Sequence, residues 1–361
     1  MKLQNYAMFL PDYTIGPKAL DGLGEICRPF GKTVLIIGGN RALAAAEEKL
    51  RRAAASAGLT VLGTEVYGTD CTYAAVERLR ALPDYRAADM VFAVGGGKSL
   101  DTSKCLCLDD GKPVFTFPTI ASNCAATTAV SIMYNEDGTF LHPHFFARPA
   151  QHCFIDTDII IASPARYMWA GIGDTYAKYY ESTISSRGEA LPHFTEMGVF
   201  VSRMCLEPLL KYAAKGYADM QAGLNSDEAE QVVLAIVVST GLASNFLTRD
   251  HTPDYNSGLA HAIFYALTKY PVIEEKHLHG EVVGFGVLLA LLVDGQEAEF
   301  QKILALNRSI GLPTRLSDID ITPEQFRETF ARVPDMSDVR HYPYRVTTDM
   351  LQSAWQRLEE A

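Results

Sequence analysis

The chain has 361 residues, which exceeds the size of one ordinary hydrophobic core and predicts two domains. Its composition, with 48% hydrophobic and 21% charged residues, is typical of a soluble globular protein. The formal net charge of −11 argues against nucleic acid or an anionic membrane surface as the main partner, because either would favour a basic face.

The first part of the chain alternates short apolar runs with helical patterns, which predicts right-handed strand–helix–strand units and a parallel sheet. Buried strands are expected at residues 33–37, from residue 60 to 63, at 89–94 and at 114–117. Helices are expected at residues 41–57, at 73–81, and from the glycines at 95–97 through Lys104.

Beyond about residue 162 the pattern becomes helical almost throughout. Pro164 is expected to open a helix that carries Asp174, and Ser226 to precede another helix. Residues 286–292 and 323–332 continue the helical pattern. The predicted fold is an α/β N-terminal domain with a parallel sheet and Rossmann-like nucleotide binding, followed by an all-α C-terminal domain. The predicted domains are residues 1–160 and 161–361, with a site expected in the cleft between them.

The seven cysteines are odd in number and contain no Cys-x-x-Cys pair, which fits reduced thiols in a cytosolic protein. Residues 1–6 lack the apolar run of a signal peptide, and no segment is interpreted as spanning a membrane. The sequence therefore predicts a cytoplasmic protein with neither a membrane nor a nucleic acid as partner.

A glycine-rich stretch, Gly95 to Asp101, follows one predicted strand and opens a helix. Glycines let a backbone approach phosphate oxygens closely, and a helix N-terminus offers free N–H groups with a favourable dipole. A second loop, residues 118–128, leaves the next strand and is rich in small and hydroxyl side chains. Two such loops at neighbouring strand ends predict nucleotide binding, although each loop alone is also compatible with a plain strand–helix connection. Asp101 and Lys104, one helical turn apart, are also compatible with an ordinary surface ion pair.

Three short sequence motifs each contain a potential metal ligand, namely Asp174, His261 or His279. The motifs are Gly171-Ile172-Gly173-Asp174, His261-Ala262-Ile263 and His279-Gly280-Glu281. One carboxylate and two neutral imidazoles suit a catalytic divalent ion with an open position. His277 is a rival to His279, but only His279 is followed by Gly-Glu.

Together, the glycine-rich stretch, the second loop and these three motifs resemble those of the iron-containing alcohol dehydrogenase superfamily, and within it the glycerol dehydrogenase branch. A closer resemblance, to bacterial hydroxycarboxylate dehydrogenases, comes from Cys124-Ala125-Ala126, Tyr134-Asn135 and His341-Tyr342-Pro343. The resemblance implies a dehydroquinate synthase-like two-domain architecture, NAD or NADP as cofactor, a homo-oligomer, and one divalent ion, with zinc favoured over iron. It also implies that Asp174, His261 and His279 hold the ion. The implied dinucleotide contacts are Asn40, Gly96, Gly97, Lys98, Asp101, Thr119, Ser122, Thr128, Val130 and Tyr134.

Two departures from the family pattern concern the substrate. Glycerol dehydrogenases carry an aspartate where this chain has Cys124, and the loss of that charge favours a carboxylate substrate, the alternative being a tolerated loop substitution. Phe264 replaces the second histidine of the family's His-Ala-Ile-His motif. Both residues are expected near the substrate.

A third departure concerns the cofactor. Asn40 stands where NAD-specific relatives have an acidic residue, and the adjacent Arg41 could pair with the extra phosphate of NADP or be an ordinary solvated helix residue. Either dinucleotide is therefore compatible with the sequence.

These observations predict a metal-dependent, NAD(P)-linked oxidoreductase that acts on a small hydroxy compound, with a 2-hydroxy or 2-oxo acid preferred. Glycerol with dihydroxyacetone is the alternative substrate pair. A dehydroquinate synthase-like lyase lacks an identifiable basic cluster for a substrate phosphate. A degenerate, non-catalytic dinucleotide-binding protein is the remaining alternative, suggested by Phe264.

Overall fold

The structure, a computed structural model, describes residues 6–361 and comprises two compact units. The first unit ends at Pro164 and the second runs from Ala165 to Ala361, so the division falls slightly later than the expected one after residue 160. The Asp156 carboxylate accepts hydrogen bonds from two backbone N–H groups of the α6 helix (Thr157–Ile161) and caps it. This cap keeps the short α6 helix attached to the strand that precedes it.

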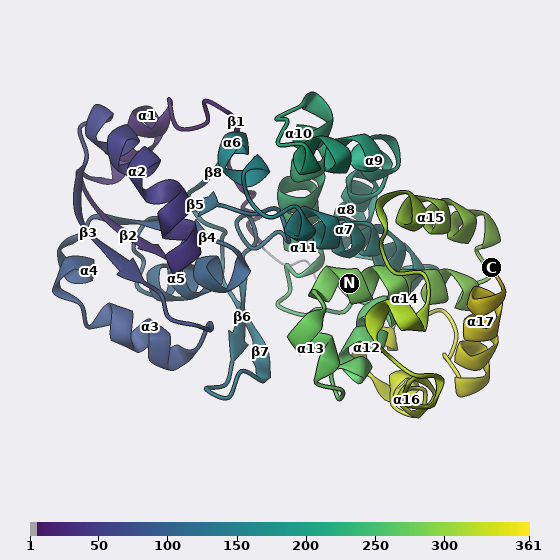
Figure 1. Ribbon diagram of the computed structural model, residues 1–361. Helices are drawn as coiled ribbons and strands as arrows, with labels where there is room; N and C mark the ends of the chain where they lie inside the picture. The colour runs from purple at the N-terminus through teal and green to yellow at the C-terminus, as the bar shows by residue number, and fades with distance from the viewer. Residues whose placement is uncertain (1–5) are drawn as a thin grey trace. The chain divides into compact units, whose positions relative to one another are not determined.

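The first unit is built on a six-stranded parallel sheet with the strand order β1–β8–β5–β4–β2–β3 (Figure 1). All predicted strands and helices of this unit are present, which confirms its α/β class. The strands are β1 (Tyr13–Gly16), β2 (Thr33–Gly38), β3 (Thr60–Val66), β4 (Met90–Gly95), β5 (Val114–Pro118) and β8 (His152–Asp156). The helices are α1 (Leu23–Cys27), η1 (Arg28–Phe30), α2 (Asn40–Ser56), α3 (Tyr73–Arg80), α4 (Pro83–Ala87), α5 (Gly97–Asp109) and α6.

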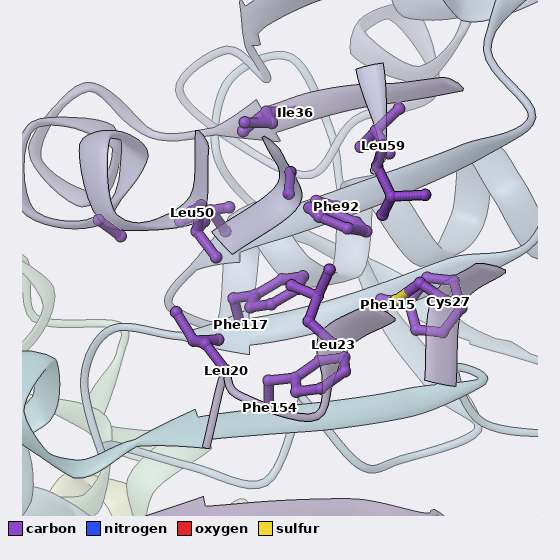
Figure 2. Packing of buried hydrophobic residues seen from close by; sticks show 14 of the residues in the cluster. Leu20, Leu23, Cys27, Ile36, Leu50, Leu59, Phe92, Phe115, Phe117 and Phe154 are labelled. Carbon is purple, nitrogen blue, oxygen red and sulfur yellow. The ribbon is translucent and has the colours of Figure 1, made fainter. Parts of the chain in front are cut away.

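Aromatic side chains from neighbouring strands form the centre of this core. The ring centroids of Phe92 and Phe117 are 4.8 Å apart, and those of Phe117 and Phe154 are 5.1 Å apart in a stacked arrangement. Figure 2 shows these rings beside leucines of the covering helices. Strands β4 and β5 are buried along their whole lengths, as expected for a parallel sheet covered on both faces.

A separate antiparallel hairpin of β6 (Val130–Tyr134) and β7 (Phe140–Phe145) was not predicted. Strand β7 contains Pro143 and carries exposed side chains at its start, so it lacks the apolar alternation by which strands are recognised.

Every regular element described in the second unit is a helix, which confirms the all-α prediction (Figure 1). The α-helices are α7 (Arg166–Ser185), α8 (His193–Val201), α9 (Glu207–Gln221), α10 (Asp227–Val233), α11 (Thr240–Leu247), α12 (Leu259–Leu267), α13 (Val272–Lys276), α14 (His279–Val293), α15 (Glu297–Ile310), α16 (Pro323–Thr329) and α17 (Thr348–Glu360). Short helical turns are η2 (Ser202–Cys205), η4 (Leu316–Ile319), η5 (Val333–Asp335) and η6 (Ser337–Val339).

Helices α10 and α11 are joined through a π-helical turn, η3 (Leu234–Ser239), into one helix over Asp227–Leu247. By length and apolar composition this helix is able to cross a membrane, contrary to the expectation that no segment would be. However, 67% of its apolar stretch is buried inside the protein, as in a core helix of a soluble fold.

Candidate metal centre and nucleotide loop

The structure brings Asp174, His261 and His279 together. The Nε2 atoms of His261 and His279 each lie 3.5 Å from Oδ1 of Asp174. One ligand atom from each residue lies within 4.8 Å of the other two. Two donors bound to one ion at about 2.1 Å in a tetrahedral arrangement are about 3.4 Å apart, so the three side chains fit a divalent ion.

The cluster is buried on one side and open on the other. His261 is buried, whereas the side chain of His279 is 44% exposed. Three potential ligands with an accessible side resemble the arrangement around a catalytic ion that keeps a position for substrate, rather than a closed structural site.

Close packing of α7 against α14 sets the distance between Asp174 and His279. A methyl group on Gly173 would overlap the backbone oxygen of Gly280, and one on Gly280 would overlap the backbone oxygen of Ala170. The two helix backbones therefore approach each other at positions where only glycine fits. This explains the glycines beside two of the three ligands.

Glu181 orients His261, a role that was not predicted from the sequence. Its Oε2 lies 2.6 Å from Nδ1 of His261, and its Oε1 accepts a hydrogen bond of 3.0 Å from the His261 backbone N–H. A carboxylate on Nδ1 directs Nε2 toward the ion position and increases its basicity. Glu181 follows Asp174 by seven residues on α7, so helical spacing places both on the same face and could have revealed it.

Tyr342 holds the start of the helix that carries His261. Its hydroxyl oxygen accepts a hydrogen bond of 3.1 Å from the backbone N–H of Leu259, the first residue of α12. The unsatisfied N–H of a helix terminus thus gains a partner from a distant segment.

The charges in the cluster perturb one another strongly. Burial alone would raise the pKa of Asp174, but hydrogen bonds and charge from His261 and His279 outweigh it and hold that pKa well below its usual range. Burial alone would lower the pKa of His261, but Glu181 and Asp174 outweigh it and raise the pKa to about 10. In the absence of an ion, the two carboxylates therefore retain a proton on His261 at neutral pH.

His277 is not part of the cluster. Its Nδ1 lies 2.8 Å from Oε1 of Glu281, and its Nε2 lies 3.5 Å from Oδ2 of Asp320. The other oxygen of Glu281 accepts a hydrogen bond from the Leu278 N–H and caps α14. The structure thus favours His279 over its rival.

Phe264 lies one helical turn after His261 and contacts the other imidazole. Its ring centroid is 4.4 Å from that of His279, in an edge-to-face arrangement. The substituted position therefore borders the cluster directly and presents an apolar ring where a polar one stands in the family motif.

In the first unit, the two predicted loops leave the carboxyl ends of the adjacent strands β4 and β5. Gly95 adopts a φ of +142°, and methyl groups on Gly96 and Gly97 would crowd Ile120 and Asn123 of the second loop. The positive φ favours glycine at position 95, and the small size of Gly96 and Gly97 lets the second loop approach closely. Thr119 and Ser122 lie in the second loop, and the backbone N–H of Thr119 donates to the backbone oxygen of Gly95 in the glycine turn.

Two of the predicted dinucleotide contacts, Lys98 and Tyr134, lie against each other. Lys98 is exposed, forms an ion pair with Asp70 and places its ammonium 4.9 Å from the ring centre of Tyr134. Asn40 is also exposed and is the first residue of α2, at the carboxyl end of β2.

Asp101, Thr128 and Val130 surround a buried lysine. The Nζ of Lys104 lies 3.0 Å from Asp101 Oδ1 and donates to the backbone oxygens of Thr128 and Val130. The alternative of a surface ion pair is wrong, because the Lys104 side chain is fully buried. The arrangement attaches the second loop and β6 to α5. Cys124 is partly exposed within the second loop, and its backbone oxygen accepts from Thr127.

Gly173→Ala is expected to weaken both the fold and metal binding, because the added methyl meets rigid backbone and must separate α7 from α14. The free energy of unfolding should fall by about 1–3 kcal/mol, as for overpacked cores. Denaturant unfolding and zinc titration measure the two effects. Gly216→Ala is a matched control, since its methyl would crowd backbone atoms of Glu228 and Ala229 at another helix contact. It should lose stability but keep its metal affinity; equal loss of affinity in both variants would contradict the assignment.

Metal affinity is expected to rise with pH between about 6.5 and 10, because the ion must displace a proton from His261. The stability of the metal-free protein is expected to change with pH in the opposite direction. A folded-state pKa above the ordinary 6.5 stabilises the metal-free protein fully below pH 6.5, and that contribution is lost as pH rises toward about 10.

Calorimetric zinc titrations in buffers of different ionisation enthalpy measure the proton released. The Glu181→Gln variant should release fewer protons per zinc bound and should bind zinc about 10–100-fold more weakly. The control is Glu274→Gln, at an exposed position, which should behave as the unmodified protein. Unchanged proton release in Glu181→Gln would contradict the role of this carboxylate.

The chain is similar to known proteins in both sequence and structure. The family model for iron-containing alcohol dehydrogenase matches residues 11–150. A glycerol dehydrogenase of Pseudomonas putida is 32% identical over 321 residues, covering 86% of this chain and 84% of that protein. Hydroxycarboxylate dehydrogenase A of Escherichia coli K12 is 31% identical over 327 residues, covering 89% and 88% respectively.

Among solved structures, a probable glycerol dehydrogenase from Sinorhizobium meliloti 1021 superimposes with a TM-score of 0.80 and 28% identity, over 99% of this chain and 98% of that one. The resemblance stated from the sequence is confirmed by these matches. The chain belongs to the iron-containing alcohol dehydrogenase family and is a metal-dependent, NAD-linked oxidoreductase that acts on CH–OH groups of small molecules.

Proposed function

We propose that the protein interconverts a small vicinal diol of the glycerol type with the corresponding hydroxyketone, using a nicotinamide dinucleotide. The observation that carries this proposal is the cluster of Asp174, His261 and His279 with its open side. Glycerol dehydrogenases that resemble the chain in sequence and in structure support the substrate class. The order of preference from the sequence, with the hydroxy acid first, is therefore reversed.

A divalent ion held by the three side chains would act as a Lewis acid on the substrate oxygen and lower the pKa of the alcohol. Glu181 keeps Nε2 of His261 directed at the ion position through its contact with Nδ1. Phe264 packs against His279 in an edge-to-face arrangement and would restrict the orientation of that ring. Since position 264 carries no ionisable group, a proton relay through it is not available, and the substrate proton leaves by another route.

The dinucleotide is proposed to bind to the first unit, with its phosphates at the glycine turn and the N-terminus of α5. This assigns residues 1–160 and 161–361 to dinucleotide binding and to metal and substrate binding, respectively. The proposed contacts are those predicted from the sequence: Asn40, Gly96, Gly97, Lys98, Asp101, Thr119, Ser122, Thr128, Val130 and Tyr134. Asp101 and Thr128 would act by holding the loop, since their side chains contact Lys104.

A 2-hydroxy acid is the second candidate substrate, favoured by one residue. Cys124 is neutral and partly exposed, so it does not repel a carboxylate as the family's aspartate would. The similarity to hydroxycarboxylate dehydrogenase A supports the same alternative. We further propose zinc rather than iron as the ion, a homo-oligomeric assembly and a cytoplasmic location.

Activity is expected to depend on the ion and to be highest with glycerol and dihydroxyacetone. Kinetic measurements with these compounds and with 2-hydroxybutyrate and 2-oxobutyrate, before and after chelation, test both expectations; metal analysis of the purified protein distinguishes zinc from iron. His261→Ala should lose the ion and its activity, whereas His277→Ala, outside the cluster, should keep both. Undiminished turnover after complete metal removal would contradict the mechanism. A higher kcat/KM for the acids would favour the 2-hydroxy acid as the substrate. Cofactor binding without any turnover would favour the non-catalytic alternative.

The neutral side chain of Asn40 is expected to permit both NAD and NADP, because it lacks the charge that repels the extra phosphate. Asn40→Asp should lower kcat/KM with NADPH more than with NADH. Steady-state kinetics with each cofactor measure this difference, and Arg41→Gln tests the adjacent guanidinium. An equal effect of Asn40→Asp on both cofactors would exclude this position from the ribose site.

A further inference from the structure

A second group of potential metal ligands lies in the first unit, away from the glycine turn. It consists of Cys105 and Asp109 on the second half of α5 and His144 on β7. Nε2 of His144 is 3.1 Å from Asp109 Oδ1, and the Cys105 sulfur is 3.8 Å from Asp109 Oδ2. One ligand atom from each residue lies within 4.8 Å of the other two.

The His144 ring is held by a contact on its other nitrogen. The hydroxyl of Tyr73, on α3, lies 2.9 Å from Nδ1 of His144. A hydroxyl can donate or accept, so it supports the tautomer in which Nε2 is free to bind a metal. An oriented imidazole with a hydrogen bond on its outer nitrogen is characteristic of metal-ligating histidines.

The donor set selects the kind of ion. A thiolate, an imidazole and a carboxylate together suit zinc, whereas calcium and magnesium prefer oxygen alone. Donors on zinc are about 3–4 Å apart, which matches both measured separations. The Asp109 and His144 side chains are 39% and 25% exposed, so an ion and a water molecule can enter from solvent while the Cys105 thiol lies beneath.

We propose that Cys105, Asp109 and His144 form a second zinc-binding site, which fastens the β6–β7 hairpin to α5. Binding replaces the thiol proton of Cys105 by the ion and releases that proton to solvent.

Cobalt titration of the full-length protein separates this site from the first cluster, which contains no sulfur. The expected result is a sulfur-to-cobalt charge-transfer band that grows with about one equivalent of Co²⁺ and is displaced by Zn²⁺. Cys105→Ser and His144→Gln should abolish the band, and Tyr73→Phe should weaken binding about 10–100-fold. Cys107→Ser is the matched control, because Cys107 is a buried thiol of the same helix outside the cluster, and it should keep the band.

Amide hydrogen exchange gives an independent measurement. Zn²⁺ should slow exchange in β7 of the unmodified protein and of Cys107→Ser, but not of His144→Gln. The proposal is overturned if the unmodified protein gives no charge-transfer band, if the band persists in Cys105→Ser, or if Zn²⁺ leaves exchange in β7 unchanged.

Discussion

The contact between α7 and α14 is the constraint on which the second unit's chemistry depends. The two backbones meet at Gly173 and Gly280, and each glycine stands beside a ligand of the cluster. A methyl group at either position would overlap a backbone oxygen of the facing helix, so α7 and α14 would have to separate. Gly173 and Gly280 are thus helix-packing residues, unlike Gly95, whose positive φ forms a turn.

Charge balance is the second determinant of the cluster. Asp174 and Glu181 place two carboxylates around the His261 imidazole, all in largely buried surroundings. Such an arrangement is stable only when positive charge lies between the carboxylates. A proton serves in the metal-free protein, and a divalent ion would serve better. The same groups that make the site selective for cations therefore also make it sensitive to pH.

Much of this architecture could be predicted from the sequence, because the central strands are apolar runs and the ligands stand in distinctive phrases. What could not be predicted depends on three-dimensional neighbours. Strand β7 has an exposed, proline-containing sequence, and Lys104 gives no sign in the sequence that it is buried against Thr128. The helix over Asp227–Leu247 has the composition of a membrane span, and only its burial distinguishes it. Glu181 was overlooked although its helical spacing from Asp174 was available.

The three proposed ligands come from α7, α12 and α14, which are separated by long stretches of the second unit. An ion bound there holds only the folded arrangement of these helices, and so it stabilises the second unit selectively. At an ion concentration one hundred times the Kd, this linkage contributes about 2.7 kcal/mol. The availability of the ion would therefore control how long the second unit of a newly made chain persists against unfolding and proteolysis, independently of turnover.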